Sequence, residues 1–217
     1  MRSVSTLLLV VLVAAPATAG SIHGSVRVPP LSANSASFSA SGTRDSSVAA
    51  TTRGSRGLVT DAVIFVESLP AGVRTPPHAL SPQLAQREQS FEPRVVVVPA
   101  GGTVDFPNFD PVFHDVYSVS PVRRFELGKY PRGQSRHVAF PRAGLVNVSC
   151  KIHPEMAAFI LVVPNPAWAR PGTDGEYQLS GLPPGHYRLH WWHPDLPTGA
   201  SDVEVPASGD VALDVTF

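Results

Sequence analysis

The sequence predicts an all-β protein. Short segments rich in valine and aromatic residues alternate with turn residues, and 23 prolines and 17 glycines punctuate the 217 residues. No stretch repeats its apolar residues with the period of a long helix. Short strands joined by tight turns are typical of β-sandwiches, so we expect one or two of them in this chain.

The N-terminus has the pattern of a secretory signal peptide. Arg2 is followed by an apolar run at residues 7–15 and by the small residues Ala17 and Ala19. That run is too short to span a bilayer, and no later segment is long enough. We therefore expect residues 1–19 to be removed by a cut after Ala19, which places the mature chain in the periplasm or outside the cell. A retained N-terminal anchor is the alternative.

The first third of the mature chain contains two expected strands, at residues 22–28 and 62–67. Residues 31–57 between them are rich in Ser, Ala, Thr, Gly and Arg and contain few large apolar residues, so we expect a flexible insertion. Residues 71–90 are polar and rich in proline, as in a linker. Within this linker, Ser81-Pro82 could begin one short helix.

Residues 91–164 have the densest strand pattern and form the expected central domain. Residues 125–132 contain Gly and Pro and are expected as a loop. The strands expected in this domain are 94–98, 103–106, 116–119, 135–140, 145–150 and 157–163.

The C-terminal tail has a third strand pattern but is short. It contains only about 45 residues, close to the size at which a domain cannot hold itself together. The two N-terminal strands lack partners, so we expect residues 20–70 and 165–217 to form one small discontinuous β-sandwich around the central domain. Two consecutive separate units are the alternative. Strands are expected in the tail at 176–179, 187–192, 202–205 and 211–217.

Cys150 is the only cysteine of the chain, and it begins a C-x2-H-x2-M loop with His153 and Met156. Exported proteins mostly use cysteines in pairs, so a single one is a reactive liability or a ligand. A buried structural thiol is the alternative. Thiolate and thioether favour a soft metal, and Cys with two His and a weak axial Met forms the electron-transfer copper site. The loop supplies three of these ligands.

The second histidine must come from elsewhere among the eight in the chain. His114 is the best candidate because it follows a strand and a loop in which apolar residues crowd the imidazole. The distance in sequence to Cys150 leaves room for two or three strands, so a sandwich can bring both segments to one end. The expected site is one mononuclear copper ion held by His114, Cys150, His153 and Met156.

With these residues in view, residues 95–163 resemble a cupredoxin domain, the blue-copper fold, with an amicyanin-like ligand loop. The stretch from Asn108 to His114 is similar to the family segment that carries the first His ligand. The whole chain resembles exported bacterial "methylamine utilisation proteins", which combine a cupredoxin core with flanks like a carboxypeptidase regulatory domain. The flank resemblance rests on residues 22–26, 62–66, 174–177 and 182–187.

The resemblance implies a Greek-key β-sandwich in which His114, Cys150 and His153 are strong equatorial ligands and Met156 is the weak axial one. Cupredoxins commonly have Asn after the first His; this chain has Asp115, so we hypothesise an Asp115–Lys151 contact that ties the two ligand loops together.

The resemblance also suggests a docking surface. Pro111, Val112, Phe113 and Pro154 are expected to surround the exposed edge of His153, where an unidentified redox partner would dock. Loop packing is the alternative role for these residues.

A second metal site at His190-Trp191-Trp192-His193 is not expected. On a strand the two His would point to opposite faces, and buried Trp with surface His is the favoured interpretation.

The leading function is that of a periplasmic one-electron carrier with type 1 copper. The alternatives are a copper chaperone or store, and a carbohydrate- or protein-binding module. We do not expect an enzyme, because nucleophile-elbow and zinc-protease motifs are absent from the sequence, as are H-x-H pairs and a second Cys. Seventeen basic and seventeen acidic residues give zero net charge, without a basic stripe for nucleic acid.

Overall fold

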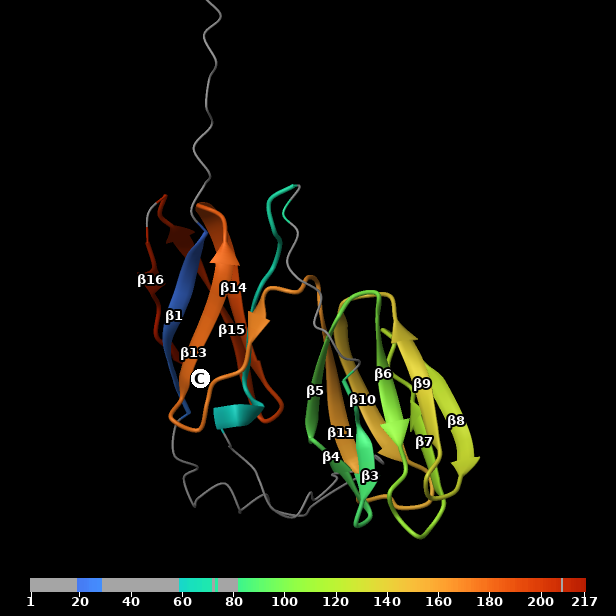
Figure 1. The fold of residues 1–217 in the computed structure, drawn as a ribbon. Coiled ribbons are helices and arrows are strands. Elements are labelled where there is room, and N and C mark those ends of the chain that lie inside the picture. The colour runs from blue at the N-terminus through green and yellow to red at the C-terminus, as the bar shows by residue number, and fades with distance from the viewer. Residues whose placement is uncertain (1–18, 29–58, 72, 74–81, 208) are drawn as a thin grey trace, which may run out of the picture.

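The computed structural model describes residues 19–28, 59–71, 73, 82–207 and 209–217. The expected signal peptide, apart from Ala19, and the expected insertion at 31–57 lie outside these residues. The described chain is all-β, as predicted, with one short 3-10 turn, η2 (Val59–Asp61) (Figure 1). Within it, helices capable of crossing a membrane are absent.

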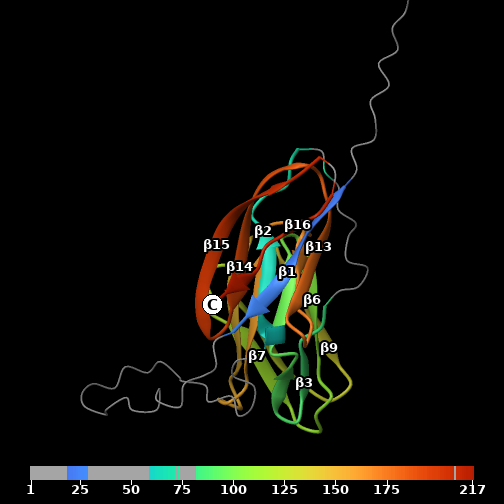
Figure 2. The ribbon, with the colours of Figure 1, turned by 90° about the vertical axis from the view of Figure 1, so that its left-hand side faces the viewer.

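Two β-sandwiches lie side by side in Figure 1, and each has its own buried core. The first, here called the flanking sandwich, combines strands from both ends of the chain. One of its sheets has the order β13-β1-β16, with β17 also paired to β1, so β1 lies between segments from the C-terminal region (Figure 2). Its strands in this sheet are β1 (Gly20–Arg27), β13 (Glu176–Leu182), β16 (Val211–Ala212) and β17 (Val215–Thr216).

The opposite sheet of the flanking sandwich has the order β12-β2-β14-β15. Alternating apolar residues of both sheets face each other, and Ile22, Ile64 and Leu189 are fully buried between them. The strands of this sheet are β2 (Val63–Val66), β12 (Trp168–Ala169), β14 (Gly185–His193) and β15 (Leu196–Val205).

The second sandwich, here called the central sandwich, is built from residues 82–163. Its larger sheet has the order β5-β11-β10-β7-β8, in which β5 and β11 run parallel, and the β6–β9 pair covers it. Phe106, Phe140 and Ile160 are fully buried in its core. Its strands are β5 (Val95–Pro99), β6 (Gly102–Pro107), β7 (His114–Ser118), β8 (Phe125–Tyr130), β9 (Ser135–Phe140), β10 (Gly144–Cys150) and β11 (Ala157–Val163).

The prediction of a loop at residues 125–132 is wrong for most of this range, because β8 (Phe125–Tyr130) pairs antiparallel with β7. Gly128 takes a positive φ of 66° near an irregularity in this pairing, and Tyr130 is fully buried. A bulge that accommodates glycine thus continues the strand where the composition had suggested a loop.

The expected linker at residues 71–90 is wrong from residue 82 onward, and so is the short helix beginning at Ser81-Pro82. Ser81 lies outside the described residues, but Gln83 already forms a bridge with Asp105 of β6. The chain then forms the hairpin β3 (Ala85–Arg87) and β4 (Ser90–Glu92). Leu84 is fully buried in the central core, so these residues complete that core instead of linking two domains.

The two sandwiches contact each other through a third apolar cluster. Val97, Leu161 and Val163 of the central sandwich pack with Val63 and Trp192 of the flanking sandwich. At the same boundary, Arg94 pairs with Asp195 through both guanidinium nitrogens at 2.7 Å and with Asp61 at 3.4 Å. Apolar packing and a bidentate ion pair therefore join the two sandwiches.

In the segment His190-Trp191-Trp192-His193, both histidines are expected at the surface. This prediction is wrong for His193. His193 is 2% exposed, and its Nδ1 accepts the N–H of Asp195, whereas His190 stacks half-exposed on Phe65. The His193 ring also packs edge-on against Phe217, so the ring lies inside the fold while it accepts the N–H of the turn that follows.

Candidate metal centre

The candidate site lies at one end of the central sandwich, where β10 and β7 meet. The β10–β11 hairpin pairs Ser149 with Ala157, so the loop from Cys150 to Met156 closes a rigid hairpin. The N–H of Met156 donates to the carbonyl of His153 at 3.0 Å, which tightens this loop. The adjacent strand β7 begins at His114 and pairs Val116 with Cys150. The sheet register therefore brings the two segments together.

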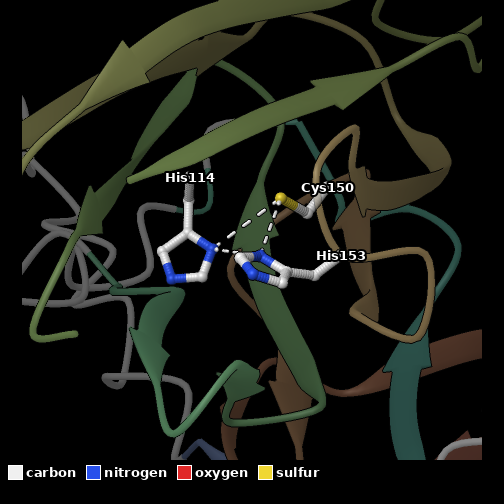
Figure 3. Close-up of side chains that lie close together, drawn as sticks. All are labelled: His114, Cys150 and His153. Atoms are coloured by element: carbon white, nitrogen blue, oxygen red, sulfur yellow. Dashed lines mark hydrogen bonds between the residues drawn. The ribbon is translucent and has the colours of Figure 1, made fainter. Parts of the chain in front are cut away.

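Three side chains converge at this point, as Figure 3 shows. The Sγ of Cys150 lies 3.7 Å from the Nδ1 of His114 and 3.8 Å from the Nδ1 of His153. The two Nδ1 atoms lie 3.1 Å apart, and the ring planes are tilted by 55°. Each ring thus presents one nitrogen to the same small triangle as the sulfur.

The size of this triangle fits a metal ion. The point equidistant from the three atoms lies about 2.1 Å from each, close to the metal bond lengths of about 2.0–2.1 Å for imidazole and about 2.3 Å for thiolate. No rearrangement of the loops is therefore needed for the three atoms to share one ion.

The four predicted ligands differ in how far they are buried. His114, Cys150 and Met156 are 0%, 3% and 1% exposed, and Met156 belongs to the same core cluster as Cys150. His153 is half-buried. A trigonal set of one thiolate and two imidazoles with a nearby thioether is the donor set of a type 1 copper site. Its only ligand near solvent, among these four, is His153.

The second nitrogen of the His114 ring is bound to a carboxylate. Nε2 lies 2.8 Å from Oδ2 of Asp110, and both groups are buried. Since an ionised carboxylate can only accept, Nε2 carries the proton and donates it. The Asp110 contact therefore fixes the tautomer that leaves the Nδ1 lone pair free for a metal.

Asp110 is itself held by the tip of the β3–β4 hairpin. Its two carboxylate oxygens accept the backbone N–H groups of Glu88 at 2.5 Å and Gln89 at 2.9 Å. Burial alone would raise the pKa of this carboxyl, but the N–H of Gln89, the His114 ring and the N–H of Glu88 together lower its pKa below the usual value. Asp110 is thus a stable buried anion beside the His114 ring.

Asn108 shapes the loop between β6 and His114. Its Nδ2 donates to the carbonyls of Val112 at 2.9 Å and Tyr130 at 3.0 Å, and its Oδ1 accepts the N–H of Asp110 at 2.8 Å. Asn108 is fully buried, and its bonds to Tyr130 and Asp110 are buried as well, so these two are protected from water. The amide positions both Asp110 and the start of β7.

The hypothesised contact between the Asp115 and Lys151 side chains takes a different form. The N–H of Lys151 donates to the carbonyl of Asp115 at 2.9 Å, so the backbones tie the two ligand segments together. The Lys151 ammonium pairs with Glu126 at 2.5 Å instead, because β8 brings that carboxylate alongside. The bond to Glu126 raises the pKa of Lys151.

Several apolar residues in the two ligand-carrying loops are exposed. Val112 is 38% exposed, Phe113 55% and Ile152 40%, and Pro111 and Pro154 are also exposed. Phe109, which is 41% exposed, lies under the Arg87 guanidinium at 4.8 Å. We call Phe109, Val112, Phe113 and Ile152 the apolar rim.

No protein-family model matches the chain, and no curated protein matches it closely. Similar solved structures include a purple cupredoxin from Nitrosopumilus maritimus, with 20% identity over 38% of this chain and 99% of that one and a TM-score of 0.35. A reduced amicyanin mutant has 24% identity over 47% of this chain and 98% of that one, with a TM-score of 0.36. A copper-containing nitrite reductase from Thermus scotoductus SA-01 has 27% identity over 44% of this chain and 24% of that one, with a TM-score of 0.37. All three scores are low, so these are similarities over part of the chain and no more.

The structure thus brings His114, Cys150 and His153 together and buries Met156 beside them. Sequence reasoning missed Asp110. The available signal was a carboxylate four residues before a candidate ligand, in a loop that begins with Asn108. The spacing becomes informative only when the folded loop is seen to bring the Asp110 carboxylate against the His114 ring.

Proposed function

We propose that this chain is an exported type 1 copper protein that carries single electrons. The observation that carries the proposal is the triangle of His114 Nδ1, Cys150 Sγ and His153 Nδ1, whose size and donor atoms suit one ion. Copper bound there would supply one-electron chemistry between Cu(II) and Cu(I). The buried thioether of Met156 fits the role of the weak axial ligand.

The protein around the triangle holds the ligands in fixed positions, which favours electron transfer. Cys150 and Met156 are buried in the core, and His114 is locked by hydrogen bonds on its far side. A donor set fixed in this way changes little between oxidation states. Because His114, Cys150 and Met156 are almost fully buried, only His153 is open to solvent, which supports a carrier over an enzyme.

We propose that electrons enter and leave at the edge of His153. This is the ligand nearest to solvent, and the exposed apolar rim and Pro154 belong to the two loops that carry His114 and His153. Large apolar side chains exposed together on one face are typical of a docking surface. An unidentified redox partner protein would bind there, with Phe113 and Pro154 in the contact.

Export to the periplasm or the cell exterior remains part of the proposal. It is supported by the apolar N-terminal segment and the small residues Ala17 and Ala19. A free Cys150, almost completely buried, is compatible with an oxidising compartment when a metal occupies it.

The test is a metal titration of the chain comprising residues 20–217. Addition of Cu(II) should give an intense visible thiolate-to-copper absorption band at one equivalent. The band should vanish in Cys150→Ser and persist in His137→Gln, a control that removes an exposed histidine of β9. Metal content should be measured in parallel, because zinc acquired during expression could fill the site.

A protein that binds copper without this band, or retains the band in Cys150→Ser, would contradict the proposal. Self-exchange of electrons separates the carrier from a chaperone or store. Rapid exchange between oxidised and reduced protein is expected for the carrier, whereas tight binding with negligible exchange indicates storage.

A further inference from the structure

The β3–β4 hairpin approaches the candidate metal centre from outside the strands that carry its ligands. Its tip consists of Glu88 and Gln89, which have positive φ angles of 50° and 53°. Non-glycine residues rarely adopt this conformation, and two in succession point their N–H groups in one direction. Both N–H groups donate to the carboxylate of Asp110.

A second contact fixes the same hairpin to the ligand loop. The N–H of Phe109 donates to the carbonyl of Gln86 at 2.9 Å, and Gln86 forms a bridge with Asn108. The hairpin is anchored on its other side by Leu84 and Phe91 in the central core. The hairpin is therefore a rigid support for the Asp110 carboxylate.

We propose that Asp110 is a positioning residue through which the β3–β4 hairpin sets the donor strength of His114 and lowers the reduction potential of the metal. This inference rests on the proposed function. Three donors converge on one buried carboxylate: the N–H groups of Glu88 and Gln89, and the ring N–H of His114. Two of these donors are backbone groups. They hold the carboxylate in its charged form and in one orientation, although the residue is buried and only 4% exposed.

The direction of the effect follows from charge. A carboxylate that accepts the Nε2 proton of an imidazole makes Nδ1 a stronger donor. A stronger nitrogen donor and a nearby negative charge favour the more highly charged ion, so Cu(II) gains more than Cu(I). The reduction potential is therefore lower with Asp110 than with a neutral residue of the same shape.

A purely structural role for Asp110 would have a different signature. If the carboxylate only held the loop in place, its loss would weaken binding of Cu(II) and Cu(I) alike and leave the potential unchanged. The reduction potential separates the two roles because it depends on the difference between the two affinities.

The experiment compares Asp110→Asn with two controls in copper-loaded protein. Asp214→Asn removes the same charge from a carboxylate that also accepts a backbone N–H, that of Ser25 in the flanking sandwich. Glu92→Gln removes a charge from the same hairpin, at an exposed side chain that pairs with Arg87 and not with Asp110. In Asp110→Asn we expect Cu(II) affinity to fall about 10–100-fold, the usual consequence of losing such a partner. Each tenfold excess of this loss over the loss for Cu(I) raises the potential by about 59 mV.

Both controls should keep the wild-type potential. An unchanged potential in Asp110→Asn, with the visible band intact, would overturn the inference and leave the proposed function standing. Absence of the band in the wild-type protein would instead refute the proposed function.

Should Asp110→Asn fail to fold, wild-type protein loaded with zinc gives a second test. Nitrogen-15 spectra should show His114 protonated at Nε2, with a ring proton that exchanges slowly with water. A rapidly exchanging proton, or protonation at Nδ1, would overturn the inference.

Discussion

The substitution Gly24→Ala tests how the two ends of the chain combine in the flanking sandwich. Gly24 lies in β1, beside the segment that joins β16 to β17. A Cβ atom placed on Gly24 would lie 2.1 Å from the carbonyl oxygen of Leu213 and 3.2 Å from the backbone nitrogen of Asp214. The N-terminal strand and the C-terminal segment thus approach each other as closely as a glycine permits.

The expected cost follows from the atoms in contact. A methyl group at 2.1 Å from an oxygen overlaps it by more than 1 Å, and the oxygen belongs to backbone that cannot rotate away. Overpacking of a core by flexible side chains costs about 1–3 kcal/mol, and this backbone contact should reach at least the upper value. About 3 kcal/mol corresponds to a fall in Tm of about 12–24 °C for a domain below 100 residues.

The assay is thermal unfolding followed by two signals in copper-loaded protein. Far-UV circular dichroism reports both sandwiches, and the visible band reports the central one. Gly24→Ala should lower the circular dichroism transition of the flanking sandwich while the band at room temperature stays unchanged. His23→Ala is the matched control, because its side chain is exposed on the same strand.

A Tm for Gly24→Ala within about 2 °C of the wild-type value would correspond to a loss of less than about 1 kcal/mol in the free energy of unfolding. That result would refute the argument, because it would mean that β1 and the C-terminal segment are not in contact. Loss of the band at room temperature would show that the two sandwiches fold as one unit through the apolar cluster between them.

Three further predictions concern the core, the charges and the response to acid. Leu84→Ala should destabilise the protein by about 2–5 kcal/mol in urea unfolding, because Leu84 is fully buried, and a cost below 1 kcal/mol would remove the hairpin from the central core. Residues 123–151 contain seven basic residues and one acidic residue, so oxidation of the reduced protein by anionic hexacyanoferrate should slow as salt is added; an identical salt dependence with a cationic ruthenium ammine would contradict this. The N–H and hydroxyl of Ser25 lower the pKa of Asp214, so its stabilising effect is complete above the ordinary aspartate pKa of about 3.9 and is lost as pH falls through the lowered value. Asp214→Asn should therefore lose less stability between pH 7 and pH 2 than the wild-type protein, and equal losses would contradict the assignment.

Much of the candidate site could be predicted from sequence because it is local. Cys150, His153 and Met156 lie in one loop between two strands, and their chemistry is visible in their spacing. His114 could be predicted because a candidate ligand after a strand and a loop stood apart from the other histidines. In each case the signal lay within about ten residues.

The features that sequence missed depend on contacts between distant segments. The β3–β4 hairpin has a polar composition, and only Leu84 and Phe91 show that it belongs to a core. Its place beside the ligand loop involves bridges of Gln83 with Asp105 and of Gln86 with Asn108, which no local pattern encodes. The strand β8 was mistaken for a loop because its pairing with β7 tolerates Gly128. Tertiary pairing outweighed local composition at both places.

The arrangement of the two sandwiches leaves the His153 end of the site accessible. The flanking sandwich packs against outward-facing residues of β5 and β11, such as Val97, Leu161 and Val163. The apolar rim lies in the loops before β7 and after β10, and none of its residues belongs to that interface cluster among the described residues. The docking proposed at Phe113 would therefore leave the flanking sandwich in place. Truncation of the flanking sandwich should accordingly alter stability more than it alters the rate of electron exchange.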